Sequence, residues 1–221
     1  MTSSASSPDE RSTRSGARGD ADAAIAAAAA RAENTRHRNL PQFDDLPVPA
    51  DTANLREGPG LHDACLPLLP LVGVWRGEGE ATYPSMAAPA RFGQQVVFAH
   101  DGRPFLYYES RSWLLDANGA VIRPAARETG WWRPQADGTI ELLLTHNTGI
   151  VEIFYGKPRT LTSWELATDI VMRTASAKEV NSGHRLYGIV HDGGLAYVEE
   201  RAMVGQPMQP HISAHLARVV G

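Results

Sequence analysis

The chain has 221 residues, 43% of them hydrophobic, and a formal net charge of −4, which allows one buried core with extensions or two small domains. The mild acidic excess argues against nucleic-acid binding, because such domains usually carry a clustered basic excess. Cys65 is the one cysteine, so no intramolecular disulfide forms. Neither a long apolar run nor a signal-peptide pattern predicts membrane insertion or export, and we expect a cytoplasmic protein without a membrane partner.

Residues 1–60 are predicted to form an extension outside the compact domain. Residues 1–20 are rich in Ser, Arg, Asp and Gly, a composition typical of disorder. The alanine-dense segment that follows, "DADAAIAAAAARAENTRHR", has high helix propensity but a thin apolar face. Residues 39–59 carry repeated prolines, which indicate an irregular linker or a strap on the domain surface. The compact domain is expected over residues 61–221.

The compact domain is expected to open with a short helical turn that leads into a glycine-rich strand, "GVWRGEGEATYP", at residues 73–84. Side chains alternate between the faces of a strand, so Gly73, Trp75, Gly77 and Gly79 share one face and the charged residues share the other. Glycine in a strand marks a bend or a close approach by a ligand or backbone. This face is either a sharply coiled barrel wall or a wall that admits a flat, bulky ligand.

Short β-rich runs with tight-turn signals between them follow this strand. Asp101-Gly102, Asn118-Gly119 and Asp137-Gly138 supply the positive φ angles that hairpins need. Sequential hairpins predict an all-β antiparallel meander, closed into a barrel or folded as a sandwich, and closure is favoured because it leaves no open edge. The last segment, "PHISAHLARVV", breaks the β rhythm. Its apolar spacing predicts a short amphipathic helix or a turn over the barrel.

Histidines near the C-terminus are the first candidates for chemistry. His211 and His215 are four residues apart, so on a helix they would share a face and could bind a metal ion. The alternative is that His215 is a surface residue, and the chain has no His-Glu-x-x-His motif to support a zinc hydrolase. A single histidine facing the barrel interior could instead be the axial ligand of a haem iron.

Other residue patterns give weaker signals. The glycine strand lacks the motifs of a phosphate-binding loop, and the chain has no Gly-x-Ser-x-Gly nucleophile motif. Lys178 lies where a turn could bring its ammonium to an anionic ligand, although a solvated surface lysine is the alternative. Four carboxylates on predicted strands are explained by side chains that alternate outward: Glu109, Glu128, Glu141 and Glu152. Nothing in the sequence selects two of them as the catalytic pair of a glycosidase.

Taken together, "GVWRGEGEATYP" and "GQPMQPHISAHL" resemble the nitrobindin family, the haem-binding β-barrels also described as peroxynitrite isomerases. That family opens with Gly-x-Trp-x-Gly-x-Gly-x-Gly-x-Tyr-Pro, from which this chain departs at Ala81. The family closes with Gln-Pro followed by a haem-ligating histidine, which places the ligand at His211 after Gln206-Pro207. Further matches are "VVFAHDGRPFLYY", "HNTGIVEI" and "AKEV". The resemblance covers residues 62–221 and leaves residues 1–60 outside it.

The resemblance implies a ten-stranded antiparallel up-and-down β-barrel, similar to lipocalins and fatty-acid-binding proteins, with one haem b. Its iron would be bound by His211, the expected catalytic residue and metal ligand, with the opposite face open to small ligands. The activity implied is isomerisation of peroxynitrite to nitrate at ferric haem, with nitric oxide binding at the same position. Residues expected to contact the haem are Gly73, Trp75, Gly77, Gly79, Ser85, Lys178 and His211, with Lys178 suited to a propionate.

Two other function classes stay open from the sequence. A non-catalytic carrier barrel for a small apolar ligand would not need His211 and would favour an internal arginine pair for a carboxylate. A nitric oxide or haem sensor would use residues 1–60 to signal to a partner. A homodimer also stays open, and the sequence assigns no distal acid–base residue.

Overall fold

The computed structural model describes residues 8–37 and 45–221, and the chain divides into two units, Met1–Pro47 and Val48–Gly221. The first unit contains the helix α1 (Pro8–Thr35). The predicted alanine-rich helix is therefore present, but it begins inside the stretch expected to be disordered. Pro8 suits the first position of a helix, because its missing N–H needs no partner there.

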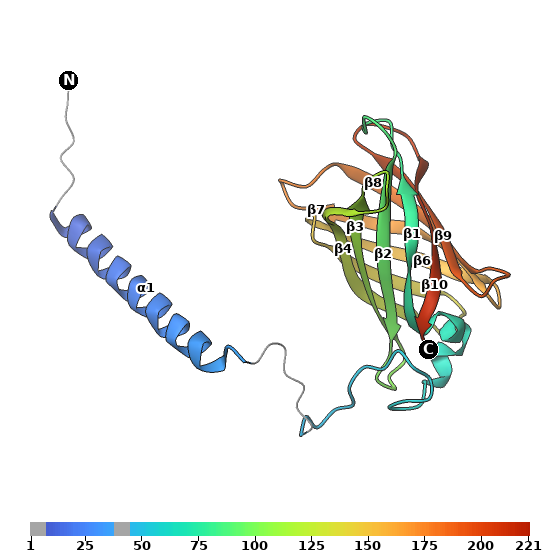
Figure 1. Ribbon diagram of the computed structural model, residues 1–221, viewed down its shortest axis with the longest axis horizontal. Coiled ribbons are helices and arrows are strands. Elements are labelled where there is room, and N and C mark those ends of the chain that lie inside the picture. The colour runs from blue at the N-terminus through green and yellow to red at the C-terminus, as the bar shows by residue number, and fades with distance from the viewer. Residues whose placement is uncertain (1–7, 38–44) are drawn as a thin grey trace. The chain divides into compact units, whose positions relative to one another are not determined.

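Ten antiparallel strands form a closed barrel in the second unit (Figure 1). In chain order these strands are β1 (Gly73–Ala81), β2 (Ala90–Ala99), β3 (Leu106–Leu115), β4 (Val121–Pro134), β5 (Ile140–His146), β6 (Ile150–Thr160), β7 (Ser163–Arg173), β8 (Val180–Ile189), β9 (Leu195–Met203) and β10 (Gln209–Val220). Each strand pairs with the next, and β10 pairs with β1, so the sheet has no open edge. The predicted up-and-down barrel is confirmed.

The C-terminal segment corrects the sequence-based expectation. Residues 209–220, expected to end in a short helix or turn, form β10, which pairs with β1 on one side and β9 on the other. Ala214 and Leu216 are buried while His215 is exposed, which is the alternation of a strand. The helical spacing was misleading because pairing on two sides satisfies the backbone of this segment, and local propensity does not decide in that context.

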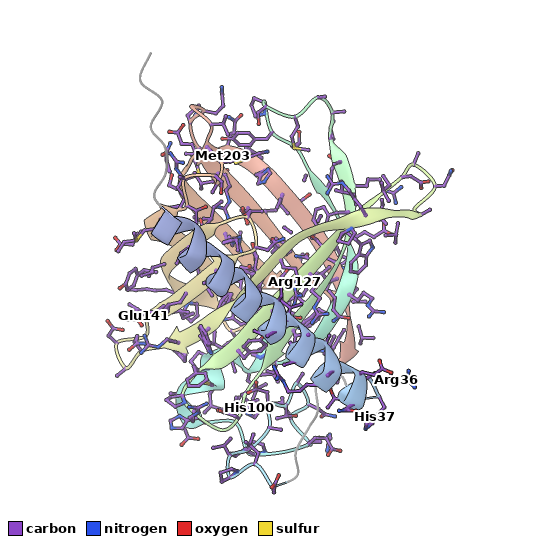
Figure 2. All side chains as sticks on the ribbon, turned by 90° about the vertical axis from the view of Figure 1, so that its left-hand side faces the viewer. Arg36, His37, His100, Arg127, Glu141 and Met203 are labelled. Carbon is purple, nitrogen blue, oxygen red and sulfur yellow. The ribbon has the colours of Figure 1, made fainter. Side chains whose placement is uncertain are left out.

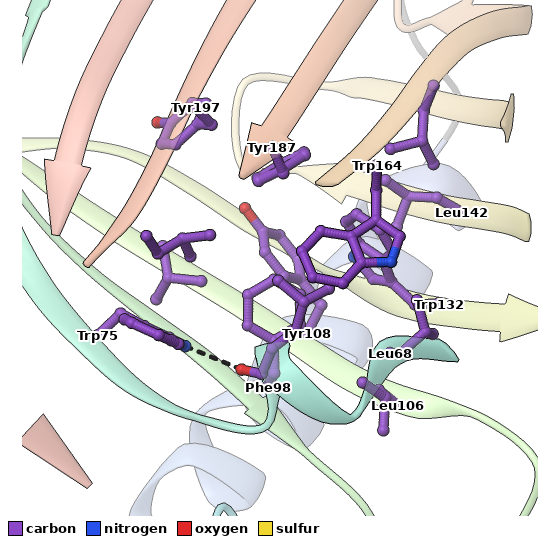
Figure 3. Packing of buried hydrophobic residues seen from close by; sticks show 14 of the residues in the cluster. Leu68, Trp75, Phe98, Leu106, Tyr108, Trp132, Leu142, Trp164, Tyr187 and Tyr197 are labelled. Atoms are coloured by element: carbon purple, nitrogen blue, oxygen red, sulfur yellow. Dashed lines mark hydrogen bonds between the residues drawn. The ribbon is translucent and has the colours of Figure 1, made fainter. Parts of the chain in front are cut away.

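One end of the barrel, called the closed end below, is covered by the 3₁₀ helix η1 (Asp63–Leu71). Two tryptophans from the barrel donate indole N–H groups to its carbonyls: Trp75 to Leu71 at 2.8 Å and Trp164 to Pro67 at 2.9 Å. Figure 3 shows the large rings that fill the barrel beside this helix. A buried indole needs a hydrogen-bond acceptor, so these bonds fix the helix over the barrel.

A segment before η1 also belongs to the barrel unit, as the strap interpretation predicted. Thr52 and His100 exchange backbone hydrogen bonds of 2.8 and 2.9 Å. The unit consequently starts at Val48, earlier than the boundary expected at Leu61. His100 is buried with no hydrogen-bond partner on either ring nitrogen, and this burial lowers its pKa.

The other end of the barrel, called the rim below, is formed by the loops that follow β1, β3, β5, β7 and β9. Figure 2 shows Met203 at this end and His100 at the opposite one. A small apolar cluster, the rim cluster, lies here and is separate from the main core. Its members are Tyr83, Ile150, Val180 and Met203, with Met86, Val171 and Ala177 packed against them.

Candidate functional site

His211 lies at the rim, at an irregularity in β10. Pro210 pairs with Glu200 of β9 and Ile212 pairs with Glu199, so His211 is an extra residue without a cross-strand partner in β9. This is a β-bulge, a feature that re-aims side chains and is common beside functional sites. On the β1 side, Thr82 donates its backbone N–H to the His211 carbonyl at 2.8 Å. The bulge therefore changes the direction of one side chain without breaking the barrel.

The imidazole of His211 is held in a form suited to metal binding. Its Nδ1 lies 3.1 Å from the carbonyl oxygen of Thr82. A carbonyl only accepts hydrogen bonds, so Nδ1 carries the proton and Nε2 of the neutral ring keeps a free lone pair. Histidines that bind metals typically donate their second nitrogen to a carbonyl or carboxylate in this way. The donor set at His211 fits the axial position of a haem iron.

His211 lines a cavity of about 410 Å³ between β1, β8, β9 and β10. Apolar side chains provide part of this wall, with Leu186, Val198 and Ile212 among them. A neighbouring groove of about 840 Å³ shares Leu186 and Val198 with the cavity and extends toward His215. Small-molecule sites typically have volumes of about 300–1,000 Å³ and mostly apolar walls, so this face of the barrel is suited to an organic ligand.

Two other predicted residues lie at the same end as His211. Ser85 is exposed in the loop between β1 and β2, and Lys178 is exposed in the loop between β7 and β8. Their neighbours Met86 and Ala177 pack against the rim cluster. The structure therefore brings the loops that carry Ser85 and Lys178 to the rim.

Gly73 and Trp75 lie at the closed end instead. Trp75 is fully buried, and the guanidinium of Arg218 lies 4.1 Å from its ring centroid. A Cβ atom at Gly73 would lie 2.7 Å from the carbonyl oxygen of Val220. About 20 Å of strand separates Trp75 from Ala81 at the rim. The structure does not bring these two predicted contacts together with His211, and both are packed against β10.

Gly77 and Gly79 lie midway along β1, where the predicted open wall is filled. A Cβ atom at Gly79 would lie 2.4 Å from the ring of Phe92, and one at Gly77 would lie 2.2 Å from the carbonyl oxygen of His215. Real Cβ atoms do not approach so closely. The glycines therefore accommodate the Phe92 ring and the backbone of β10, which corrects the expectation that this face lies open to a flat ligand.

Sequence reasoning missed a ring of six ionisable side chains inside the barrel, called the ion ring below. In order around the ring these are Glu128, Arg185, Glu199, Arg201, Glu152 and His146. Arg185 contacts Glu128 at 2.6 Å through Nη2 and Glu199 at 2.7 Å through Nε. Tyr108 donates its hydroxyl to Glu128 at 3.0 Å. These ion pairs form one half of the ring, although the Nε–H of Arg185 makes no hydrogen bond.

The other half is built on Arg201. This residue donates to both carboxylate oxygens of Glu152, at 2.6 and 2.9 Å, and also contacts Glu199. His146 lies 2.7 Å from Glu152 and 3.5 Å from Glu128, which closes the ring. Burial opposes the charge of Glu152, but His146 and Arg201 outweigh it and hold its pKa at about 2. Glu152 is therefore ionised at neutral pH.

The ion ring corrects the outward assignment of two carboxylates. Glu152 is fully buried and Glu128 faces the same interior, whereas Glu141 forms a surface pair with Arg133. The sequence carried a signal for this, since Glu199 and Arg201 have the strand parity of the core residue Tyr197. A charged pair in phase with core aromatics indicates buried ions.

The ion ring also bears on the carrier alternative. Arg185 and Arg201 form the internal arginine pair that a fatty-acid carrier would use, but the three carboxylates of the ring already bind them. No guanidinium is left for the carboxylate of a ligand. His215 is exposed and lies 3.0 Å from Asp192, so it does not join His211 in a metal site. Within residues 8–37 and 45–221, no cluster of three metal-ligating side chains occurs.

Comparison with known families identifies the class of this barrel. The family described as "THAP4-like, heme-binding beta-barrel domain" matches residues 64–218. The chain belongs to this family of haem-binding β-barrels.

Individual relatives narrow the class. The chain is 62% identical to the ferric nitrobindin-like protein of Saccharopolyspora erythraea over 205 residues, covering 92% of this chain and 96% of that protein. It is 54% identical to peroxynitrite isomerase 1 of Mycobacterium marinum, covering 92% and 94% of the two chains. The alignment of 205 residues is longer than residues 62–221. It therefore includes part of residues 1–60, which the resemblance in the sequence motifs had left out.

A solved structure supports the fold. The crystal structure of Rv2717c from M. tuberculosis has a TM-score of 0.63 and 38% sequence identity, and the match covers 72% of this chain and 98% of that one. The barrel is therefore shared with an experimentally determined relative.

Proposed function

We propose that this protein binds one haem b through Nε2 of His211 and isomerises peroxynitrite to nitrate. The observation that carries the proposal is the contact of His211 Nδ1 with the Thr82 carbonyl, which leaves Nε2 as a metal ligand beside a cavity. Relatives that are 51–62% identical include proteins named ferric nitrobindin-like protein and peroxynitrite isomerase. When bound, the haem supplies an iron that acts as Lewis acid and redox partner for the O–O bond.

The chain itself contributes orientation, apolar walls and charge. The Thr82 carbonyl keeps the proton on Nδ1 of His211, so the neutral ring presents the lone pair of its second nitrogen to the metal. Leu186, Val198 and Ile212 line the cavity and displace water from the apolar part of the cofactor.

Lys178 and Ser85 are the polar contacts that we propose at the rim. Both are exposed on loops whose neighbouring residues pack in the rim cluster. An ammonium suits a haem propionate or the anionic substrate, because opposite charges attract across partly desolvated space. The Ser85 hydroxyl can donate one hydrogen bond to the same polar edge.

The test compares His211→Ala with His215→Ala, two substitutions on the same strand. Purified protein is titrated with haemin, and the Soret absorption and nitrate formation from peroxynitrite are measured. His211→Ala should lose the Soret band of the bound haem and the isomerisation while keeping the circular dichroism of the barrel. His215→Ala should match the unmodified protein, because that side chain is exposed and paired with Asp192. Unchanged absorption and activity in His211→Ala would refute the assignment.

Nitric oxide binding and a cytoplasmic location belong to the same proposal. If nitric oxide binds the haem, adding it to the haemin-loaded protein would change the Soret band. Over residues 8–37 and 45–221, none of the helices has the length and apolar character needed to cross a bilayer. Cys65 is a buried free thiol whose pKa burial raises to about 11, and an unreactive, unpaired thiol is compatible with a reducing compartment.

A further inference from the structure

Tyr83 is the aromatic residue whose ring lies against the imidazole of His211. The two ring centroids are 5.4 Å apart with an interplanar angle of 81°, the edge-to-face arrangement that aromatic rings prefer. Tyr83 is 3% exposed and belongs to the rim cluster. The ring that touches His211 is therefore surrounded by packed side chains.

The hydroxyl of Tyr83 fixes that ring to a different strand. It accepts the backbone N–H of Met203 at 2.9 Å, and it lies 3.1 Å from the carbonyl oxygens of both Arg201 and Met203, to which it donates. A phenol has one proton to donate, and here that proton and an acceptor site are both used on β9. Rotation of the ring would leave buried backbone groups unpaired, which is costly.

The sequence around Tyr83 supports the same role. Pro84 restricts the preceding residue to an extended backbone, which fixes the direction in which Tyr83 leaves β1. Thr82, on its other side, provides the carbonyl for Nδ1 of His211. Two consecutive residues thus control two properties of one imidazole: Thr82 the position of its proton, and Tyr83 the plane of its ring.

We propose that Tyr83 is a positioning residue that orients the His211 imidazole toward the haem iron. This inference rests on the proposed function of His211. Because of the bulge, His211 has no cross-strand partner in β9. The link between β9 and the imidazole is therefore Tyr83, whose hydroxyl bonds to β9 and whose ring contacts His211. A misoriented imidazole forms a weaker bond to the metal, and loss of an outer-shell contact typically lowers metal affinity by about 10- to 100-fold.

The test measures how fast haem is lost from the full-length, haemin-loaded protein to excess apomyoglobin. Tyr83→Leu removes the ring and should accelerate haem loss about 10-fold or more. Tyr83→Phe keeps the ring but removes its anchor, and should give a smaller acceleration. Tyr155→Leu is the matched control, because Tyr155 is exposed on β6 and its loss should leave the rate unchanged. The iron–histidine stretching frequency of the reduced protein should shift in both Tyr83 variants.

A second background separates orientation from simple packing. In His211→Gly supplied with imidazole, the axial ligand is not attached to the chain, so adding Tyr83→Leu should have little further effect on haem loss. An equal effect in both backgrounds would mean that Tyr83 is only a wall of the pocket, and the inference fails. If Tyr83→Leu does not fold by circular dichroism, Tyr83→Phe decides by the same two readouts.

The two proposals fail in different ways. If His211→Ala keeps the Soret band, His211 is not the ligand and the proposed function is wrong. If His211→Ala loses that band while both Tyr83 variants keep the unmodified rate and frequency, the proposed function stands and only the role of Tyr83 is refuted.

Discussion

The two ends of the barrel use the same strands for different purposes. At the closed end, β1 and β10 carry Trp75 and Arg218, which stack on each other and hydrogen-bond to carbonyls in or next to η1. At the rim, Thr82, which directly follows β1, contacts the bulged His211 of β10 beside exposed loops. The closed end stabilises the fold, and the rim presents a side chain with an unused nitrogen. Stability and chemistry are therefore separated along one pair of strands.

Trp75→Ala should have the largest effect, because it destroys the packing of the closed end. The substitution removes a fully buried ring, its bond to Leu71 and its contact with Arg218, so we expect a loss of about 5 kcal/mol in the free energy of unfolding. Urea denaturation measures this loss. Trp131→Ala on exposed β4 surface is the control and should cost at most about 1 kcal/mol. Similar losses in the two variants would contradict the stabilising role of the closed end.

Arg201→Met breaks the ion ring, between the two ends. It leaves Glu152 and Glu199 buried with less positive charge around them, and we expect a loss of about 4 kcal/mol at pH 7. Arg159→Met removes a surface pair with Glu165 and should cost under about 1 kcal/mol. Denaturation curves of the two variants at one pH give the comparison. If Arg201→Met lowers the free energy of unfolding no more than Arg159→Met does, the charges of the ion ring do not stabilise one another.

The ion ring also predicts how stability depends on pH. The folded-state pKa of Glu152 is lowered from 4.5 to about 2, so the unfolded chain binds the proton more tightly. The stabilisation, about 3 kcal/mol, is present above pH 5 and is lost as the pH falls toward 2. Glu152→Gln should flatten this part of the stability curve, whereas Glu141→Gln on the surface should keep its slope. A slope in Glu152→Gln equal to that of the unmodified protein would exclude Glu152 as the source.

Lys178→Ala should have the smallest effect and should act at the rim alone. An exposed lysine contributes little to folding, so the unfolding free energy should change by less than about 0.5 kcal/mol. Haemin affinity should fall by about 3-fold, a change of about 0.7 kcal/mol, and more salt should shrink the difference. Haemin titrations at two salt concentrations measure this. Arg133→Ala, on the exposed surface of β4, is the control and should bind haemin normally.

The hairpins were the most predictable part of the fold. Gly102, Gly119 and Gly138 all have φ angles near +80 to +88°, as the Asp-Gly and Asn-Gly pairs indicated. β10 was missed because the apolar spacing of a short segment can fit both a helix and a strand. Pairing with β1 and β9 selects the strand. His211 was selected as the candidate ligand through its place after Gln206-Pro207 rather than through its surroundings.

The interior of the barrel was predictable only in part. The glycines of β1 were correctly seen as sites of close approach, but their neighbour is Phe92, which lies on another strand and cannot be read from local spacing. The ion ring joins residues from β4, β5, β6, β8 and β9. Such contacts depend on the register of several strands across the barrel. The pattern within one strand shows only which residues face the interior.

The ion ring contains three carboxylates, two guanidinium groups and one imidazole, contributed by five different strands. Charged groups in a medium of low polarity interact strongly with one another, so each carboxylate of the ring is held by its neighbours in the ring. This interior is already occupied by packed rings and paired charges. Under the proposed function, substrate and product would therefore share the solvent-facing side of His211.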